Sequence, residues 1–296
     1  MVATVLVLGA SGRVGSHVVK ELGAHHEGIT VRLATSRAAV AEQWRAEGRE
    51  AVVLDLDRPE GFAEALQGVD RVFLLTGYSS AMLYQSKKFV DAAVDAGVSH
   101  IVHLGVFSSP QDMIPHFNWH ILIETYIEAS GIAWTHIHPN VISDSMLVST
   151  PPINETGSFP VFWRDVPQGW VFASDIGAVA AAVLREGPAK HGGANYWLST
   201  EVLTGPEVAD ILSEASGIEI KCLMLGPEAM QAVADKLPTI PERAYMESAV
   251  TYMELAAAGA LQFQTVVRDD VKTVLGRPGL TMAQWAKENL VTGTCK

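Results

Sequence analysis

Cysteines and basic residues are scarce in this sequence, and long apolar runs are missing from it. Cys222 and Cys295 are the only cysteines among 296 residues, too few for a disulfide framework, which favours a reducing compartment. The 21 lysines and arginines are outnumbered by 33 acidic residues, and the net charge of -12 repels both nucleic acid and anionic lipid. No stretch approaches the roughly 20 apolar residues that span a bilayer. We therefore expect neither a nucleic-acid nor a membrane partner.

The apolar start of the chain does not have the form of a secretory signal. Residues 2–8 follow no basic segment, and the run stops at a glycine after the length of one strand. Apolar residues make up 48% of the chain and charged residues 18%, so a sizeable core is available. These features predict a cytoplasmic protein with one large α/β unit, alone or with a smaller companion.

The first 140 residues alternate short β-branched runs with amphipathic helical patterns. Strict alternation of this kind is typical of right-handed crossovers between parallel strands that helices cover on both faces. We predict an α/β fold with a Rossmann-type doubly wound parallel sheet, whose ligands bind at the carboxyl ends of the strands. The predicted strands are Thr4–Leu8, Ile29–Ala34, Ala51–Leu54, Arg71–Thr76, His100–Leu104 and Ala133–His138, and the predicted helices are Gly12–Leu22, Ala38–Glu47, Glu60–Gln67, Met82–Ala96 and Phe117–Ala129.

Beyond Asn140 the pattern becomes irregular and then mainly helical. Residues 149–170 are rich in proline, glycine and aromatic residues, which predicts an irregular excursion. The segment "ASDIGAVAAAVLREG" returns to a helix, with Ser174 or Asp175 as its expected N-cap. The chain then continues with a strand in "NYWLS", a capped helix that ends at Gly217, and helices at Met246–Ala258 and Thr281–Leu290.

This change of pattern predicts two units in one chain. We assign residues 1–142 and 171–194 to a dinucleotide-binding domain. We assign residues 143–170 and 195–296 to a smaller, mostly helical substrate lobe. The sequence leaves open whether the chain forms a homodimer.

Three glycines follow the first predicted strand and open the first helix, in "GASGRVG". In this context Gly9 permits a tight turn, Gly12 lets the backbone approach a pyrophosphate, and Gly15 lets the helix pack closely on the sheet. The pyrophosphate then meets unpaired N–H groups at the helix N-terminus. A tight turn without a ligand is the alternative interpretation. The full set of expected ligands in this loop is Gly9, Ser11, Gly12, Arg13, Val14 and Gly15.

The end of the second predicted strand indicates which nicotinamide cofactor is bound. An NAD enzyme usually places Asp or Glu there to bind the ribose 2′-hydroxyl, whereas a basic residue there receives the NADP 2′-phosphate. No acidic residue occurs between Glu27 and Glu42, and Ser36 and Arg37 stand in the segment. We therefore expect NADP(H). In the alternative interpretation Arg37 is only a solvated loop residue.

The Gly-x-x-Gly-x-x-Gly spacing resembles the extended and atypical branches of the short-chain dehydrogenase/reductase superfamily. The resemblance implies a Tyr-x-x-x-Lys pair on the helix after the fifth strand, where the tyrosine protonates the product oxygen and the lysine lowers its pKa. The match Tyr84-x-x-x-Lys88 falls on the helix before that strand, and we interpret it as a coincidence. No lysine occurs between Lys88 and Lys190, so the usual carbonyl-reducing pair is absent.

Three stretches, "GASGRVG", "PHFNWHILIETYIEASGIAWTHIHPNVI" and "DDVKTVLGRPGLTMAQWAKENL", resemble the NmrA-like atypical branch over essentially the whole chain. The chain is similar to the triphenylmethane reductase and type 2 quinone oxidoreductase members of that branch, which also contains redox-sensing regulators that bind NADP without turnover. His120 stands where many members carry lysine, and an Arg-Pro-Asn turn of the branch appears here as His138-Pro139-Asn140.

The resemblance makes His120 our candidate catalytic residue. It implies that His120 orients the cofactor or donates one proton near neutral pH; the alternative is a structural polar residue on a helix. It also implies that Thr76, Gly77 and Gly105 lie along the cofactor, and that Pro139 and Asn140 frame the nicotinamide.

The missing tyrosine acid favours a substrate that spreads charge over a π system. Such a substrate needs positioning and a dry pocket more than a strong acid. We expect Phe107, Trp119, Phe162 and Trp163 to line that pocket, although core packing is the usual fate of aromatic residues. Four nearby histidines lack a Cys or carboxylate at ligand spacing, so we expect no metal. The sequence thus predicts an NADPH-dependent reductase of a quinone, an aromatic polyketide-like or a dye-like substrate. A non-catalytic NADP(H)-sensing regulator that acts through protein partners is the alternative.

Overall fold

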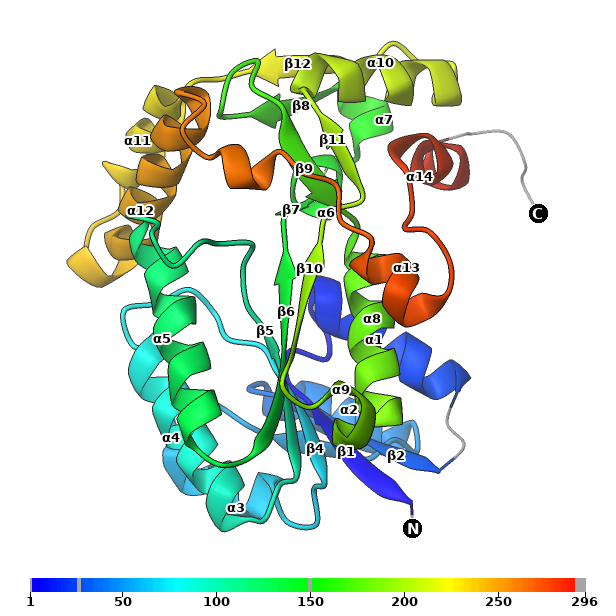
Figure 1. Cartoon of the computed structure of the whole chain (residues 1–296), viewed down its shortest axis with the longest axis vertical. Coiled ribbons are helices and arrows are strands. Elements are labelled where there is room, and N and C mark those ends of the chain that lie inside the picture. The colour runs from blue at the N-terminus through cyan, green and yellow to red at the C-terminus, as the bar shows by residue number, and fades with distance from the viewer. Residues whose placement is uncertain (1, 26–27, 149–150, 291–296) are drawn as a thin grey trace.

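A seven-stranded parallel sheet forms the lower part of the molecule (Figure 1). The structure is a computed structural model, and it describes residues 2–25, 28–148 and 151–290. The strand order is β10-β6-β5-β4-β1-β2-β3, and every neighbouring pair is parallel. The direction of winding reverses between β1 and β4, so the predicted doubly wound Rossmann-type fold is confirmed. The strands are β1 (Ala3–Val7), β2 (Ile29–Thr35), β3 (Ala51–Val53), β4 (Arg71–Leu74), β5 (His100–Leu104), β6 (Ala133–Pro139) and β10 (Ala194–Leu198).

The seventh strand corrects our boundary between the two units. The segment "NYWLS" forms a strand as predicted, but β10 pairs in parallel with β6 and extends the large sheet. Residues 195–198, which we assigned to the lobe, therefore lie in the sheet. The register joins Trp197 to His138, and their rings stack with centroids 4.0 Å apart.

Helices cover both faces of the sheet. The cluster of buried side chains on one face joins α3 (Phe62–Ala65), α4 (Met82–Asp95) and α5 (Pro115–Ala129) to the strands. The opposite face is covered by α1 (Arg13–Ala24), α2 (Ala38–Ala46) and α8 (Ala173–Glu186). Because helices cover both faces of the sheet, the central strand β5 is buried along its whole length, including its two histidines.

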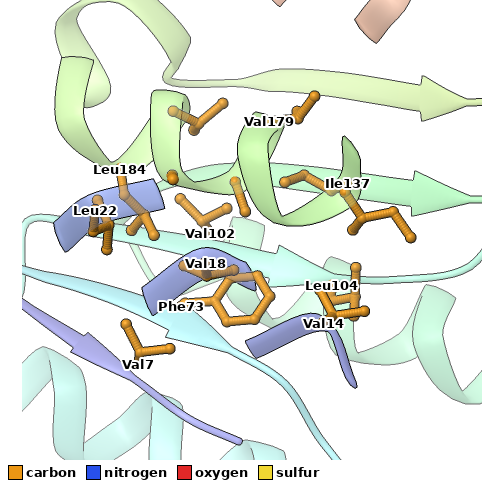
Figure 2. Packing of buried hydrophobic residues seen from close by; sticks show 14 of the residues in the cluster. Val7, Val14, Val18, Leu22, Phe73, Val102, Leu104, Ile137, Val179 and Leu184 are labelled. Carbon is orange, nitrogen blue, oxygen red and sulfur yellow. The ribbon is translucent and has the colours of Figure 1, made fainter. Parts of the chain in front are cut away.

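The packing of α1 against α8 holds the glycine loop over the sheet (Figure 2). Val14, Val18 and Leu22 recur at four-residue spacing and present one apolar face of α1 to the core. Gly177 of α8 lets the two helices approach, because a Cβ there would lie 2.4 Å from the Cβ of His17. The beginning of α1 is thereby fixed at the carboxyl end of β1.

Most of the remaining elements form the smaller lobe, at the top of Figure 1, with its own buried cluster that includes Phe159, Trp163 and Trp170. Two short sheets, β11-β9-β7 and β12-β8, are combined with helices there. These strands are β7 (Val141–Ile142), β8 (Ser158–Val161), β9 (Gln168–Val171), β11 (Glu201–Leu203) and β12 (Lys221–Met224). The other helices of the chain are α6 (Asp144–Leu147), α7 (Ile153–Thr156), α9 (Pro188–His191), α10 (Gly205–Ser216), α11 (Pro227–Ala234), α12 (Ile240–Ala257), α13 (Asp270–Leu275), α14 (Met282–Asn289) and the 3-10 turns η1 (Pro59–Gly61) and η2 (Gln262–Gln264).

The excursion that we predicted after residue 148 is more ordered than its composition suggests. It contains α7, β8 and most of β9, because its aromatic residues pack into the lobe core. Its first two residues, Ser149 and Thr150, lie outside the described residues, as does Cys295.

Helix ends show where local signals were sufficient and where they were not. Thr204 and Glu207 form the capping box of α10, and Gly217 ends that helix with a φ of 72°. The expected N-cap of α8 was wrong: Phe172 occupies the cap position, and the Ala173 N–H donates to the Asp144 carboxylate at 2.8 Å. Asp175 instead accepts hydrogen bonds from the tail at residues 277–280.

Candidate functional site

The glycine loop forms the tight turn that its spacing predicts. Gly9 has a φ of 62°, and the Gly12 N–H donates to the Gly9 carbonyl at 2.8 Å. A Cβ at Gly15 would lie 2.1 Å from that same carbonyl oxygen, so the third glycine is required by backbone packing. The N-cap residue Gly12 has no side chain to cap α1, so the first N–H groups of the helix, beside the cavity that Gly12, Arg13 and Val14 line, lack a side-chain cap.

A polar cleft of about 390 Å³ opens on one side of this loop. The Arg37 guanidinium, at the end of β2, donates to the Ser11 hydroxyl at 3.2 Å and forms no ion pair with any described carboxylate. Asp57, farther along the cleft, is engaged by the Gln85 amide at 2.7 Å. The lining residues of this polar cleft are Leu8, Gly9, Ser11, Ala34, Thr35, Ser36, Arg37, Leu54, Asp55, Leu56, Asp57, Leu75, Gly77, Tyr78, Ser79 and Gln85.

A second cavity, of about 450 Å³, lies on the other side of the loop, where the large sheet meets the lobe. We call it the aromatic cavity. Its walls come from the glycine loop, the carboxyl ends of β4, β5 and β6, and the helices α5, α6 and α12. The lining residues are Gly9, Gly12, Arg13, Val14, Leu75, Thr76, Tyr78, Leu104, Gly105, Val106, His116, Phe117, His120, Pro139, Asn140, Val141, Ile142, Ser145, Met146, Trp163, Tyr245, Ala249, Tyr252, Met253 and Gln264.

Aromatic rings organise one wall of this cavity. Tyr78 stacks on Tyr245 with ring centroids 4.3 Å apart and planes 8° apart, and it meets His116 and His120 edge-on at 5.5 and 5.6 Å. The His116 ring is held by Ser248, whose hydroxyl lies 2.6 Å from Nδ1. The wall therefore offers flat apolar faces with a few polar atoms at their edges, which suits a planar ligand.

Three of the four aromatic residues that we expected in the pocket do not line it. Trp163 does, and packs against Trp170 behind the wall. Phe107 is buried against Trp197 at 5.1 Å, Trp119 packs on the core under α4 and α5, and Phe162 packs into the lobe core. Alternation along β8 and its extension turns Trp163 inward and Phe162 away, a choice that the composition of the segment does not reveal.

His120 lies at the cavity, buried between two other polar groups. Its Nε2 is 3.2 Å from the Tyr78 hydroxyl and its Nδ1 is 3.4 Å from Nε2 of His103. Burial lowers the pKa of His120 to about 3, with His116 and His138 adding to the effect. This shift disfavours a stored positive charge on the ring near neutral pH, and our expectation that His120 orients the cofactor or donates one proton stays a prediction.

The other expected ligands divide between the two spaces. Thr76, two residues after the end of β4, lines the aromatic cavity, and its buried hydroxyl has no hydrogen-bond partner among the described residues. Asn140 is partly committed to structure, since its amide donates to the Gln264 carbonyl at 2.8 Å. The aromatic cavity contains Gly12, Arg13, Val14, Thr76, Gly105, Pro139 and Asn140, the polar cleft contains Ser11, Ser36, Arg37 and Gly77, Gly9 borders both, and Gly15 borders neither.

Several residues that line the cavity or lie behind its wall were missed at the sequence level. Tyr245 and Tyr252 are seven residues apart, a spacing that places both on one face of α12. Glu124 follows His120 by four residues and lies beneath it on α5, and Tyr78 directly follows the two expected residues at the end of β4. The spacing signals existed for these, but nothing indicated that α12 would fold over the cavity.

The Tyr84-x-x-x-Lys88 match lies away from both spaces. Tyr84 is 58% exposed on α4, with the Lys88 amine 5.9 Å from its ring centre. Within the described residues, no group of three or more His, Cys, Asp or Glu side chains is arranged to hold a metal ion. In the same part of the chain, no helix combines the length and the apolar character needed to cross a membrane.

Comparison with known proteins gives consistent matches along the chain. The model of the NmrA-like family matches residues 1–271. The NAD(P)H azoreductase of Xenophilus azovorans is 30% identical over 285 residues, 96% of each chain, and the quinone oxidoreductase 2 of Escherichia coli (strain K12) is 25% identical over 95% of this chain and 96% of that protein.

Two solved structures share the fold. Citrobacter sp. triphenylmethane reductase complexed with NADP(H) has a TM-score of 0.79 and 23% identity, covering 97% of this chain and 100% of that one. The negative transcriptional regulator Nmra in complex with NAD has a TM-score of 0.75 and 18% identity, covering 97% and 95%.

Proposed function

Since the chain belongs to the NmrA-like family, we propose that it is an NADPH-dependent reductase of planar, conjugated substrates such as quinones or dyes. The observation that carries this proposal is the aromatic cavity, which adjoins the open N-terminus of α1 and is walled by Tyr78, Tyr245 and Trp163. A protein that only senses a dinucleotide has no need for a second, ring-lined space beside it. The azoreductase and quinone oxidoreductase relatives act on substrates of this shape.

The residues of both spaces fit a dinucleotide phosphate. The uncapped start of α1 offers N–H groups to a pyrophosphate, and the end of β2 offers the Ser36 hydroxyl and the unpaired Arg37 guanidinium to a 2′-phosphate. The unpartnered Thr76 hydroxyl is suited to a ribose or carboxamide group. No acidic side chain stands at the end of β2 to bind a 2′-hydroxyl and repel a phosphate. The triphenylmethane reductase neighbour was solved with NADP(H).

The cavity residues then have distinct tasks. The bound NADPH supplies a hydride. Gly105, Pro139 and Asn140, at the ends of β5 and β6, would border the nicotinamide, and the rings of Tyr245 and Trp163 would hold the substrate flat and exclude water. His120 stays neutral and holds the Tyr78 hydroxyl toward the cavity. Positioning and dehydration are sufficient for an acceptor whose π system spreads the incoming charge.

The test is consumption of NADPH by the purified chain with a panel of quinones, cationic triarylmethane dyes, azo dyes and conjugated ketones. We expect turnover with at least one planar conjugated class and none with simple aliphatic ketones, which need a strong acid at oxygen. If NADPH binds but no acceptor oxidises it, the reductase function is wrong and a NADP(H)-sensing regulator takes its place.

A further inference from the structure

A file of polar side chains connects the aromatic cavity with the outer edge of α5. It begins at the Tyr78 hydroxyl, 3.2 Å from His120 Nε2, and continues from His120 Nδ1 to His103 Nε2 at 3.4 Å. Nδ1 of His103 then lies 3.8 Å from Oε1 of Glu124. The four residues come from the loop after β4, from α5 and from β5, so that tertiary folding alone aligns them.

The last gap in the file separates two polar atoms that lack hydrogen-bond partners. His103 Nδ1 and Glu124 Oε1 are both buried and neither has a hydrogen-bond partner, although each faces the other. Leaving a buried polar atom unpaired costs about 1–3 kcal/mol, so such atoms are retained where they have a task. A small rotation of the Glu124 side chain closes the gap. The Glu124 side chain as a whole is 13% exposed, so it lies at the boundary between the buried file and the solvent.

Gly105 makes room for this carboxyl group beneath the cavity. A Cβ at residue 105 would lie 2.5 Å from Glu124 Oε1 and 3.2 Å from His138 Nδ1. The glycine that we expected to border the cofactor therefore also lets Glu124 reach the carboxyl end of β5.

On the basis of the proposed function, we propose that Glu124 is the proton reservoir for quinone reduction, and that His103, His120 and Tyr78 relay its proton to the substrate oxygen. Tyr78 touches the substrate and is the catalytic residue of the relay. His120 and His103 carry the proton between Tyr78 and Glu124, and Glu124 acts through them.

The relay balances as a sequence of single proton shifts. A quinone that gains a hydride becomes the anion of a hydroquinone and needs one further proton. Tyr78 Oη–H gives that proton, His120 Nε2–H restores the phenol, His103 Nε2–H passes to His120 Nδ1, and Glu124 Oε1–H passes to His103 Nδ1. Both imidazoles end neutral in their other tautomer, Glu124 ends as a carboxylate, and water reprotonates it. A turn of each ring then resets the tautomers.

The pKa shifts of Glu124, His103 and His120 agree with this role, whereas burial, with Tyr245 adding to it, raises the pKa of Tyr78 and makes fast reprotonation by His120 necessary. Burial, with Glu128 adding to it, raises the pKa of Glu124 to about 8, so the carboxyl is protonated at neutral pH. Burial holds the pKa of His103 well below its usual range and lowers that of His120 to about 3. Neither ring stores a proton as a cation, which is what a relay through neutral imidazoles requires.

The charged and titratable groups around Glu124 are few. His103 faces it from β5, His138 from β6 at 3.6 Å, and Glu128 from its own helix. On the side of α4, Lys87 and Asp91 pair with each other at 2.7 Å. No described cation pairs with Glu124, so nothing on the neighbouring elements forces the carboxylate form.

Two acceptors with different proton demands test the relay in the full chain. A neutral quinone needs a hydride and a proton. A cationic triarylmethane dye takes the hydride at its central carbon, where the new C–H bond cancels the positive charge, and it needs no proton. Glu124→Gln keeps the size of the side chain but has no acidic proton to give. Glu128→Gln is the matched control, one turn farther along α5 and 46% exposed.

We expect Glu124→Gln to lower the quinone rate roughly 10- to 100-fold relative to the dye rate, as for loss of a general acid. Tyr78→Phe should change the same ratio in the same direction.

The wild-type quinone rate should fall as the pH rises through about 8, and Glu124→Gln should abolish that fall. Glu128→Gln should leave both rates within about twofold. An equal loss of both rates in Glu124→Gln would overturn the relay, whereas failure of the wild type with every acceptor would overturn the reductase function itself.

An infrared measurement without cofactor or substrate provides an independent readout. Wild-type protein should show a protonated carboxylic-acid band at pH 7 that disappears above about pH 9 and is missing in Glu124→Gln but present in Glu128→Gln. This measurement decides the matter if the wild type reduces only one acceptor class. If no such band exists at pH 7, Glu124 is ionised and is not the proton source.

Discussion

The polar cleft and the aromatic cavity flank the same glycine loop but are built in different ways. The polar cleft takes all its residues from the first 85 positions, at the ends of β1, β2, β3 and β4. The aromatic cavity gathers residues from position 9 to position 264, including the excursion at Trp163 and the helix α12. The first space is lined by hydroxyls, a guanidinium and two carboxylates, and the second is lined mainly by rings and aliphatic side chains.

This difference explains why the strand-end residues of both spaces could be named from the sequence, whereas the residues that α12 adds to the aromatic cavity could not. Ligands of the polar cleft stand directly after predicted strands, and carboxyl ends of parallel strands meet at one edge of a sheet. Side chains of the aromatic cavity come together only because the lobe closes over β5 and β6. The comparison also separates the expected effects of mutation: changes in the cleft should alter cofactor choice, and changes in the cavity should alter turnover and acid stability.

The largest effect that we expect is acid unfolding, which comes from the histidines in and behind the aromatic cavity. Burial lowers the pKa of His116 to about 4 and the pKa values of His120 and His136 to about 3. The unfolded chain binds protons at these sites below about pH 6.5 while the folded chain does not, so stability falls as the pH falls toward 4. Thermal melts should show cooperative loss of the folded state between about pH 6 and pH 4. Glu124, whose raised pKa acts in the opposite direction, is outnumbered. An unchanged melting temperature at about pH 4 would show that these rings are charged in the folded state.

Gly15→Ala should damage the loop that both spaces share. The new Cβ would overlap the Gly9 carbonyl oxygen at 2.1 Å, and backbone on both sides of the overlap cannot move without opening the turn. We expect the free energy of unfolding to fall by about 3 kcal/mol, which urea titration measures. We also expect NADPH binding to become unmeasurable, which cofactor fluorescence tests. Gly23→Ala, on the same helix, meets no heavy atom within 4 Å and should be neutral or stabilising by up to about 1 kcal/mol. Equal effects of the two variants would contradict the packing argument.

Arg37→Ala should affect the polar cleft alone. A charge-assisted contact with phosphate contributes about 1.5–3 kcal/mol, so NADPH affinity should fall roughly 10- to 100-fold while NADH affinity barely changes. Titration of each cofactor by fluorescence measures both constants. Equal losses for the two cofactors would show that Arg37 supports the loop through Ser11 rather than binding the 2′-phosphate.

His120→Gln should affect the aromatic cavity alone. The amide can still bond to the Tyr78 hydroxyl but cannot pass a proton between two ring nitrogens, so we expect kcat with a quinone to fall about tenfold or more. NADPH affinity should be retained. A lower melting temperature with unchanged kcat would assign His120 a structural role, since it is fully enclosed by His103, Tyr78 and the core.

The smallest effect should come from a residue outside both spaces. Tyr84→Phe removes only a hydroxyl from an exposed position of α4, so turnover should remain within about twofold of the wild type. A loss of roughly 100-fold, as expected for a general acid, would move the active site to α4 and contradict the placement of both spaces.

Local patterns predicted most of the large sheet because the information needed was local. β5 begins and ends as predicted, and α2, α4 and α5 differ from their predicted bounds by no more than two residues, since each follows an apolar period and a turn signal. The predicted helix at Glu60–Gln67 splits into η1 and α3, because Gly61 interrupts it. The glycine loop and the absence of an acidic residue after β2 could also be recognised in the sequence, because each depends on a few neighbouring residues.

Only the tertiary structure decided the chemistry of the cavity. From the sequence alone, each histidine and glutamate is expected to have its ordinary pKa. Burial in the folded structure lowers the pKa of His120 and raises that of Glu124. Whether Trp163 or Phe162 lines the aromatic cavity depended on which side of one strand met the lobe core. Strand pairing likewise placed residues 194–198 in the large sheet. Sequence periodicity describes one element at a time, whereas desolvation and the alignment of four polar side chains arise only where separate elements pack together.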